Sequence, residues 1–525
     1  MLHHNKKYFF FIAFAFLFSS FCCAQVYKIT DATYYSMGNT RSSALMRVVP
    51  IDKDKTFETQ QELESYLNEI VQQVQNLRLL ESVDLKYTFG EKQDNFIPVK
   101  VIITVTDSKH FLVFPKFGYD SNTGAEVKLK LKDTNFLGLL NTLNFDFNVQ
   151  LKQKNELDAA EFALGSNLQY DYPFTIGITQ NSWNNDFSFS WTIGDTIPEF
   201  SYTTGFTFKL PLGMHFLSFN LAQSIIENKD YESYGDDLYA IEEAAISLPL
   251  TIGMIGGTTK VTYTPSISFV YNWDKDGINI KDDDLVSPYI ITSHSLLTTK
   301  VNWIGNLRDG FSVLGTQSFG WNFQSEQFIP SVSADIEYFK SFTFMGIASR
   351  IYAFSELNGT EKIGSKLRGI RDNQLYADGS YYALKVPAAL VFNLDLPINI
   401  ITTHWLEWGA FLFGPYDRLP SFARWFFWPA HKIFSVCDFN LQLSPFIDIA
   451  LTRNRIANTI INPEDGFYSA GIEILIYPLK WKSYVIRTSI GFDVGRLLLS
   501  NYLNTTWRDM DVQSYEFYFG LGLHY

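Results

Sequence analysis

The sequence has few cysteines and no long apolar segment beyond its first two dozen residues. Three cysteines in 525 residues exclude a disulfide scaffold. No later stretch approaches the roughly 20 consecutive apolar residues that a membrane-spanning helix needs. Acidic residues outnumber Lys and Arg by 55 to 42, and the resulting formal charge of −13 argues against a ligand bound through its phosphates, such as nucleic acid. Any membrane crossing by this chain must therefore use strands.

Motifs of common catalytic and cofactor sites are also missing. The sequence contains no Gly-x-Ser-x-Gly, no His-Glu-x-x-His and no Gly-Lys-Ser/Thr phosphate loop. Its eight histidines are scattered, and a single one, such as His404 or His524, is far more often a polar wall residue than a catalyst. A triad assembled from distant strands would leave no linear motif. We therefore expect no enzymatic activity, no cofactor and no metal site.

The first 24 residues have the composition of an export signal. A basic start at Lys6 and Lys7 precedes a short apolar run and a small residue at Ala24. These three features together are typical of a secretory signal peptide. We expect residues 1–24 to be removed, which leaves Cys437 as the single cysteine of an exported, acidic protein.

The next section, residues 25–109, combines helix and strand patterns. Thr59 and Glu62 form a capping box at a helix start, and apolar residues then recur at three- and four-residue spacing. Alternating or β-branched runs at Val83–Phe89 and Val99–Thr106 predict strands. The order strand, helix, helix, strand, strand fits a small independent α+β domain, although this order alone is that of many such modules.

Residues 110–525 alternate between apolar and polar side chains. Every second residue is apolar in Leu143–Leu151 and again in Phe517–Tyr525, and the whole chain holds 47 Phe and 29 Tyr. A soluble sandwich produces the same alternation, but export, the aromatic excess and the final aromatic residue favour a transmembrane antiparallel β-barrel. With strands of about 9–11 residues, this length holds roughly 16 strands. The predicted fold class is mainly β, a barrel preceded by a β-α-α-β-β domain.

Three segments interrupt the alternation. Glu227–Glu243 and Asp274–Asp284 are acidic and rich in Asn and Gly, and we interpret both as solvated loops. Trp405–Trp428 is rich in Trp and Phe and alternates poorly. It predicts an interfacial turn or a short amphipathic helix.

One further segment, ahead of the predicted strand Ala388–Leu396, contains an Arg-Gly pair within the run Leu367, Arg368, Gly369 and Ile370. Taken alone, such a pair fits an ordinary exposed turn. Its place in the chain resembles that of the Val-Arg-Gly-Phe/Tyr motif in the long sixth extracellular loop of the BamA-like outer-membrane assembly superfamily. Here Leu367 replaces the Val, and Ile370 replaces the aromatic residue.

The resemblance covers nearly the whole mature chain. That family combines periplasmic POTRA domains with a 16-stranded barrel of the bacterial surface antigen type, and residues 25–109 resemble one POTRA domain. Five ordered segments resemble motifs of the family's barrel: Gly118–Gly138 with its Asn-Phe-Leu-Gly turn, Phe392–Asp395, Phe446–Ala450, Ser469–Ile472 and Gly491–Gly495. In Phe446–Ala450 the family's Gly is replaced by Ala450, while the Asp of the motif is retained.

An Arg inside a barrel lumen needs a carboxylate partner. A buried unpaired charge is costly, and a guanidinium binds a carboxylate through two parallel hydrogen bonds. We predict Asp448 as the partner of Arg368, with Asp395 as the second candidate. By resemblance, this pair pins the long loop inside the barrel and holds the wall near the seam, where the first and last strands meet.

The seam is where the resemblance places function. The first barrel strand includes Tyr119, and a short or twisted pairing with the last strand leaves edges that accept a client strand. Gly520 and Gly522 either weaken that last strand or only relieve crowding inside the barrel. Phe519 lies on its apolar face, and Tyr525 as the final residue resembles the signal by which barrel proteins are recognised for their own insertion.

Together these features predict an outer-membrane protein assembly, insertion or translocation factor with a POTRA-like domain in the periplasm. Its expected partners are outer-membrane lipids, unfolded barrel clients or a secreted polypeptide, and periplasmic accessory proteins or chaperones, but no nucleic acid. In the POTRA-like domain, the strand Val83–Phe89 offers a backbone edge for an extended peptide. The competing function is a passive outer-membrane channel whose periplasmic domain serves only for docking.

Overall fold

A computed structural model describes most of the chain. The described residues are 26–53, 55–93, 95–120, 124–152, 161–213, 215–227, 238–256, 259–274, 287–370, 373–375, 381–383, 385–454, 459–498 and 515–525. The predicted signal peptide, residues 1–24, lies outside them. The chain divides into two compact units, one ending at Ser108 and the other running from Lys109 to Tyr525.

The first unit is a four-stranded sheet with two helices. Its elements are β1 (Val26–Met37), α2 (Ser42–Val48), β2 (Thr56–Phe57), α3 (Gln60–Asn76), β3 (Leu80–Phe89) and β4 (Phe96–Asp107). The sheet order is β2-β1-β4-β3, with β1 parallel and β3 antiparallel to β4. The predicted order of helices and strands is therefore found, with the short β2 added to it. It also makes β3, which covers Val83–Phe89, an edge strand of the described sheet.

Helix α3 begins as its sequence predicts. The Glu62 backbone N–H donates to Thr59 Oγ1 at 3.2 Å, and Glu62 Oε2 accepts from the Glu58 backbone N–H at 3.0 Å. The apolar stripe of the helix includes Leu63 and Leu67, both fully buried. This face packs toward the sheet and forms the core of the unit.

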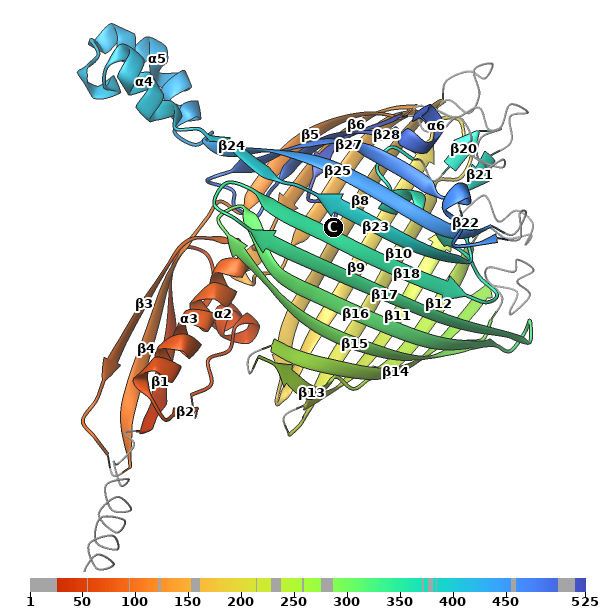
Figure 1. Ribbon diagram of the computed structural model, residues 1–525, viewed down its shortest axis with the longest axis horizontal. Helices are drawn as coiled ribbons and strands as arrows, with labels where there is room; N and C mark the ends of the chain where they lie inside the picture. The colour runs from red at the N-terminus through yellow and green to blue at the C-terminus, as the bar shows by residue number, and fades with distance from the viewer. Residues whose placement is uncertain are drawn as a thin grey trace, which may run out of the picture. The chain divides into compact units, whose positions relative to one another are not determined.

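The second unit is a closed antiparallel barrel (Figure 1). Its strands are β5 (Phe111–Asp120), β6 (Gly124–Asp133), β7 (Leu143–Lys152), β8 (Glu161–Ile176), β9 (Thr179–Thr192), β10 (Glu199–Leu212), β11 (His215–Glu227), β12 (Leu238–Ser247), β13 (Leu250–Ile255), β14 (Thr259–Asp274), β15 (Tyr289–Ile304), β16 (Leu307–Asn322), β17 (Gln327–Ser341), β18 (Gly346–Glu356), β23 (Ala388–Asp395), β24 (Ile398–Thr402), β25 (Phe439–Asn454), β26 (Thr459–Ile460), β27 (Phe467–Pro478), β28 (Ile486–Asp493) and β29 (Tyr515–Leu521). The antiparallel β-barrel predicted from the sequence is confirmed.

The barrel has more strands than its length suggests. Its order runs through 21 labelled segments. β12 and β13 are two pieces of one strand, because they pair one after the other along β14, and β23 and β24 pair in the same way along β25. The two-residue segment β26 pairs only with the end of β25, and we call it a flap. With each series counted once and the flap left out, 18 described strands close the barrel, rather than about 16. Two-residue turns at the left-handed Gly177 and Gly305 leave more of the chain for strands.

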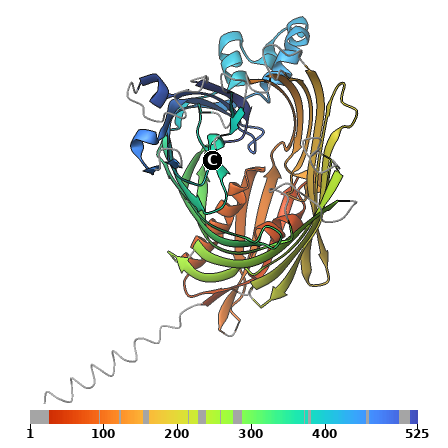
Figure 2. The same cartoon turned by 90° about the vertical axis from the view of Figure 1, so that its right-hand side faces the viewer.

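The two faces of the barrel wall differ in polarity. In β17, the side chains of Val332 and Ile336 are 53% and 41% exposed on the outside. Between them, Asp335 faces the lumen and accepts hydrogen bonds from Arg350 Nε and Nη2 at 2.9 and 2.6 Å. Figure 2 shows the strands as a ring around this interior. An apolar outside and a polar inside are the pattern of a barrel that is surrounded by lipid.

Several connections carry short elements of their own. They are η1 (Phe136–Gly138), β19 (Glu361–Lys362), η3 (Gly364–Lys366), β20 (Asn373–Leu375), β21 (Tyr381–Ala383), β22 (Lys385–Val386), α4 (Trp405–Phe413), η4 (Tyr416–Arg418), α5 (Ser421–Phe434), η5 (Pro463–Asp465) and α6 (Val494–Leu498). The segment predicted as an interfacial turn or short helix, Trp405–Trp428, is thus helical. Across the part of the chain that the structure describes, none of the helices combines the length and apolar character that a membrane crossing requires.

One predicted loop is shorter than expected. The sequence predicts a loop throughout the acidic segment Glu227–Glu243, but β12 begins at Leu238 and pairs with β11 from that residue onward. The apolar residues Leu238 and Ile241 extend the strand ladder into the acidic region. Residues 228–237, and residues 275–286 of the second predicted loop, lie outside the described residues.

Candidate functional site

The Arg-Gly segment lies within the barrel, against the inner face of its C-terminal strands. We call residues 363–370 the clamp loop; they follow β19 and include η3. Leu367, Arg368 and Ile370 are 2%, 5% and 2% exposed. The ordinary exposed turn that the Arg-Gly pair would otherwise suggest is therefore not what forms here.

Arg368 is bound chiefly to Asp448 on β25. Arg368 Nε and Nη2 donate to the two carboxylate oxygens of Asp448 at 2.9 and 2.6 Å, and the Arg368 backbone N–H donates to the same carboxylate at 2.9 Å. Asn393 Nδ2 on β23 adds a fourth hydrogen bond to Asp448 at 2.8 Å. Because Asp448 is fully buried, these four donors replace the water that would otherwise solvate its charge.

Two further carboxylates surround the same guanidinium. Arg368 Nη1 lies 2.6 Å from Asp395 and 3.2 Å from Glu473. Glu473 on β27 is also 3.3 Å from Arg487 on β28. The structure therefore brings Arg368 together with both predicted partners and adds Glu473. Glu473 was not predicted from the sequence. Its signal was a charged residue on the polar face of an alternating strand, two positions after Gly471, because such a residue points into the lumen.

Gly369 is required by the close approach of the clamp loop to the wall. Its φ of +94° is left-handed, and a Cβ added there would lie 2.5 Å from the Gly491 carbonyl carbon on β28. A Cβ added at Gly491 would lie 2.7 Å from the Arg368 carbonyl carbon. Two glycines thus face each other, and the backbones of loop and strand pack directly together.

The two apolar residues of the motif anchor the clamp loop in a buried apolar cluster. Leu367 and Ile370 belong to a buried cluster with Phe354, Val391 and Ala450, among others. Ala450, which stands where the family has Gly, is fully buried in this cluster. Ile370, which replaces the aromatic residue of the motif, fills space there without a polar group that would need a partner.

Strand register explains how the clamp loop reaches the last strand. One row of paired residues runs across five strands from β23 to β29: Asp395, Phe446, Gly471, Gly491 and Glu516. The guanidinium of Arg368 lies 3.7 Å above the ring of Phe446. At the far end of the row, the Gly369 backbone N–H donates to Glu516 Oε2 at 3.0 Å. The clamp loop therefore links the whole C-terminal arc of the wall.

The seam joins β29 to β5. The two strands are neighbours in the closed barrel, and the rings of Phe519 and Phe114 lie 5.7 Å apart there. Tyr119 lies in β5 opposite Ala125, and its side chain is outside the described residues. The described part of β29 has only seven residues.

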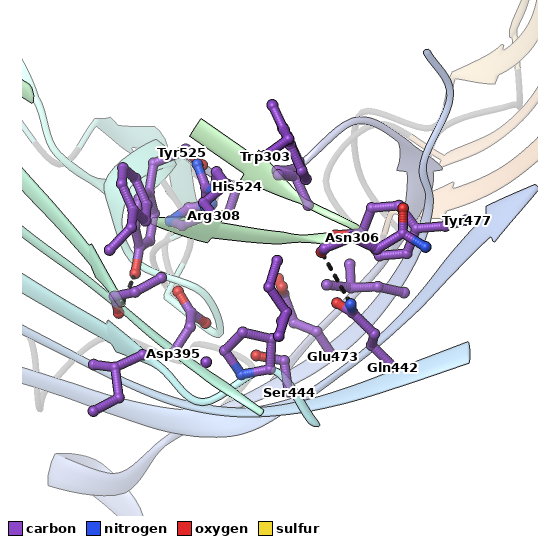
Figure 3. Close-up of a pocket in the computed structure, with 18 residues that line it drawn as sticks. Trp303, Asn306, Arg308, Asp395, Gln442, Ser444, Glu473, Tyr477, His524 and Tyr525 are labelled. Carbon is purple, nitrogen blue, oxygen red and sulfur yellow. Dashed lines mark hydrogen bonds between the residues drawn. The ribbon is translucent and has the colours of Figure 1, made fainter. Parts of the chain in front are cut away.

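The end of the chain differs from the prediction that Tyr525 continues the apolar face of the last strand. β29 ends at Leu521, and Gly522 turns the chain with a φ of +101°. Tyr525 instead lines a pocket in the lumen (Figure 3), where its hydroxyl donates to the Ala348 carbonyl at 3.1 Å and its main-chain oxygen accepts from Arg308 at 2.8 Å. Gly522 thus serves as a turn, because only a glycine adopts this φ without strain.

Gly520 has a different role from Gly522. It remains in the β29 ladder, opposite Arg487 on β28. A Cβ at Gly520 would lie 2.6 Å from Cζ of the Tyr518 ring, whose face lies 4.1 Å from the Arg487 guanidinium. For Gly520 the structure therefore favours relief of crowding, which was one of the two alternatives.

Comparisons with known proteins give structural matches only. No protein-family model and no curated protein matches this sequence. Among solved structures, CdiB from Acinetobacter baumannii is 13% identical and has a TM-score of 0.43, with 89% of this chain and 70% of that chain covered. CdiB from Escherichia coli is 9% identical with a TM-score of 0.39, covering 96% and 91%. BamA from Haemophilus ducreyi lacking POTRA domains 1–3 is 12% identical with a TM-score of 0.32, covering 88% and 80%.

These matches include BamA, the protein that gives the BamA-like superfamily its name.

Proposed function

We propose that this protein is an outer-membrane assembly or translocation factor of the BamA-like type. It would insert barrel clients into the outer membrane, or move a polypeptide across it, through the seam between β29 and β5. The observation that carries the proposal is a difference in how neighbouring strands are held. The clamp loop ties the strands from β23 to β29 together, whereas the seam directly beyond β29 joins it to β5 through a strand with only seven described residues. The proposed reaction is a rearrangement of strand pairing and needs no catalytic residue.

In this proposal the barrel opens along the seam. β15 and β16 pair over 16 residues each, whereas the described part of β29 offers seven. Each backbone hydrogen bond contributes about 0.5–1.5 kcal/mol net, so a short ladder is the easiest to separate. An open seam presents two strand edges, to which the backbone of a client strand can pair with little dependence on its sequence.

The clamp loop holds together the strands on the β29 side of the seam. Gly369 holds Glu516 on β29, and Arg368 holds Asp448 on β25, so the C-terminal arc moves as one body when the seam separates. The lumen-facing positions of Arg368 and Tyr525 are the observations that favour the assembly role over a channel.

The first unit supplies the proposed docking site for clients. β3 is an edge strand of the described sheet, and its residues are mostly half-exposed or exposed. An extended peptide could add to it through backbone hydrogen bonds, which tolerate many client sequences. In this proposal the unit is POTRA-like and periplasmic, where unfolded clients and accessory proteins or chaperones meet the barrel.

The decisive experiment is depletion of the protein in its own host, followed by quantification of folded barrel proteins in the outer membrane. A broad fall supports a general insertion factor. The loss of one exported cargo, with other barrels unchanged, supports a dedicated translocator. If neither changes and membrane conductance falls, the protein is a channel and the proposal is wrong.

A seam variant makes this test specific. In a Cys437→Ser background, the pair Phe114→Cys and Phe519→Cys is joined by a short cross-linker that forms a reducible disulfide with each thiol, and is used to complement the depletion. The control pair is Val313→Cys and Ile336→Cys, which are register partners on β16 and β17, away from the seam. We expect the seam cross-link alone to abolish complementation, and its reduction to restore it. Equal activity of both cross-linked proteins would refute a role of the seam.

A further inference from the structure

The connection between β24 and β25 is a helical hairpin that the barrel itself does not need. We call residues 405–434, comprising α4, η4 and α5, the aromatic hairpin. Its base is fixed to the strand ends. The Trp405 backbone N–H donates to Asp438 Oδ1 at 2.8 Å, its indole donates to the Cys437 carbonyl at 3.2 Å, and its ring lies 6.3 Å from that of Phe439.

The aromatic hairpin exposes large apolar side chains on both helices. Phe411, Phe422 and Trp425 are 89%, 76% and 81% exposed, and Phe426 is 70% exposed. None of its described residues is buried. The other exposed apolar residues are Leu406, Trp408, Leu412, Phe427, Trp428, Ile433 and Phe434. So many exposed apolar side chains on two neighbouring helices indicate an interaction surface, because soluble surfaces rarely leave this many aromatics in water.

The two faces of α5 have opposite character. Phe422, Phe426 and Ile433 are four and seven residues apart and therefore share one face of the helix. Arg424 and Lys432 lie on the other side, and Lys432 also stands 5.1 Å from the ring of Trp428. Trp428, four residues from both Arg424 and Lys432, lies on this basic side as well. A helix with one apolar face and cations on the other side is typical of segments that lie in a membrane surface.

The charge of the aromatic hairpin agrees with an anionic surface. It contains three basic residues, Arg418, Arg424 and Lys432, against two acidic ones, Glu407 and Asp417, in a chain whose formal charge is −13. It also carries four of the chain's 11 Trp residues, at positions 405, 408, 425 and 428. Indole rings favour the level of the lipid headgroups, where one part of the ring is apolar and the other is hydrated.

The strand that leads into the aromatic hairpin also exposes apolar side chains. Ile400 and Ile401 of β24, directly before the aromatic hairpin, are 54% and 43% exposed. Figure 2 shows α4 and α5 outside the ring of strands rather than over its opening. The 14 residues of α5 reach only about 21 Å, short of the roughly 30 Å of a bilayer core, so the helix is too short to cross a membrane.

Strand direction tells which membrane surface this is. Every pairing with a described register from β5 round to β25 is antiparallel, and the number of steps is even, so β25 runs in the same direction as β5. The aromatic hairpin precedes β25 and therefore lies at the barrel end where β5 begins. In the proposed placement of the protein, this is the periplasmic end.

We propose that the aromatic hairpin binds the periplasmic leaflet of the outer membrane, with the Phe422 face of α5 at the level of the upper acyl chains and Arg424 and Lys432 among the headgroups. The bound partner is the lipid surface, not a protein. Only β27, β28 and β29 separate the hairpin's strand β25 from the seam, so it anchors the clamped arc to the bilayer. The inference rests on the membrane placement within the proposed function and is independent of the assembly role.

Two neighbouring positions on α5 give a matched test. The mature full chain with Cys437→Ser, reconstituted in vesicles of phosphatidylethanolamine and phosphatidylglycerol, receives a single cysteine by Phe426→Cys or Arg424→Cys. Each cysteine carries an environment-sensitive fluorophore. We expect nitroxide-labelled lipid to quench the probe at 426 about twofold or more relative to 424, and aqueous iodide to show the opposite order. Val332→Cys on the outside of β17 is the reference for a barrel-wall residue in lipid.

The outcomes separate this inference from the proposed function. If the probe at 332 is quenched by lipid but the probe at 426 is quenched only by iodide, the aromatic hairpin does not bind the membrane. Protection of 426 from both quenchers identifies a protein contact, such as a second copy, and also overturns the inference. If the probe at 332 is not quenched by lipid either, the barrel is not in the bilayer and the proposed function fails with it.

Discussion

Two arcs of the same barrel are held together in different ways. In the arc β14 to β17 the strands are 15 or 16 residues long, and neighbouring strands pair over most of that length. In the arc β27 to β29, the strands have 12, eight and a described seven residues. The second arc has fewer backbone hydrogen bonds between strands, and the clamp loop lies across it.

The difference shows where side-chain interactions replace backbone pairing. A long ladder is stable whichever polar side chains face the lumen, because its hydrogen bonds belong to the backbone. The C-terminal arc from β23 to β29, which contains these short strands, also depends on a few specific groups: the three carboxylates around Arg368, the glycines at 369 and 491, and Glu516. Substitutions in the clamp loop should therefore act strongly on the C-terminal arc, while similar changes in the long-strand arc should have little effect.

The largest expected effect is that of Arg368→Ala. The substitution leaves Asp448 and Asp395 buried without their cation, which typically costs about 3–5 kcal/mol. We expect a lower free energy of unfolding in detergent and new trypsin cleavage after Lys366, because the clamp loop is released from the wall. The control is Arg350→Ala, which removes an equally bidentate Arg on β18 from Asp335 of the long-strand arc but leaves a carboxylate that is partly hydrated. Equal destabilisation by both substitutions would contradict the contrast between the arcs.

A double-mutant cycle sharpens the same prediction. Arg368→Ala and Asp448→Ala, singly and together, should show a coupling of about 2 kcal/mol or more, because the two residues share two side-chain hydrogen bonds and one from the backbone. Independent effects of the two substitutions on the free energy of unfolding would show that this pair does not hold the clamp loop.

A smaller effect is expected from Gly491→Ala. The new methyl group would lie 2.7 Å from the Arg368 carbonyl carbon and push the clamp loop away from β28, at a cost of about 1–3 kcal/mol. Gly315→Ala is the matched control, because a Cβ at this strand position in the long-strand arc has nothing within 4 Å. The urea midpoint should fall for Gly491→Ala and stay within error for Gly315→Ala. A parallel fall in both would mean that glycine content, and not the close contact, sets stability.

The smallest effect is that of Glu516→Gln, which keeps the shape of the side chain but removes its charge from the hydrogen bond with the Gly369 backbone N–H. We expect a loss of about 0.5–1.5 kcal/mol. The same variant should make the seam easier to open, detected as faster modification of a cysteine introduced at Phe519. If seam reactivity is unchanged while stability falls, the contact is structural and does not control the seam.

Much of the fold could be predicted from particular residues. Period-two alternation predicts strands on its own, because in a strand successive side chains point to opposite faces. The capping box at Thr59 and the apolar stripe that contains Leu63 and Leu67 predict α3 in the same direct way. The pairing of Arg368 with a carboxylate was predictable as well, since a buried guanidinium needs one, and Asp448 stood in a recognisable motif.

Other features of the site have no local signal. The contact between Gly369 and Gly491 joins residues more than a hundred positions apart, and glycine alone does not say what lies opposite. Glu516 and Glu473 look like ordinary polar residues of alternating strands. The inward turn of Tyr525 depends on Gly522 and on Arg308 of a distant strand, so an alternating pattern wrongly predicts that the strand continues.

What the sequence determined by itself is therefore local: which segments are strands or helices, which face of each is apolar, and which side chains carry charge that must be paired. Only the tertiary structure decided how many strands close the ring, which register brings Asp395 and Glu516 into one row, and where the clamp loop packs. The reason is physical. Periodicity and capping act within a few residues, whereas register and closure are set by the simultaneous packing of strands that are far apart in the chain.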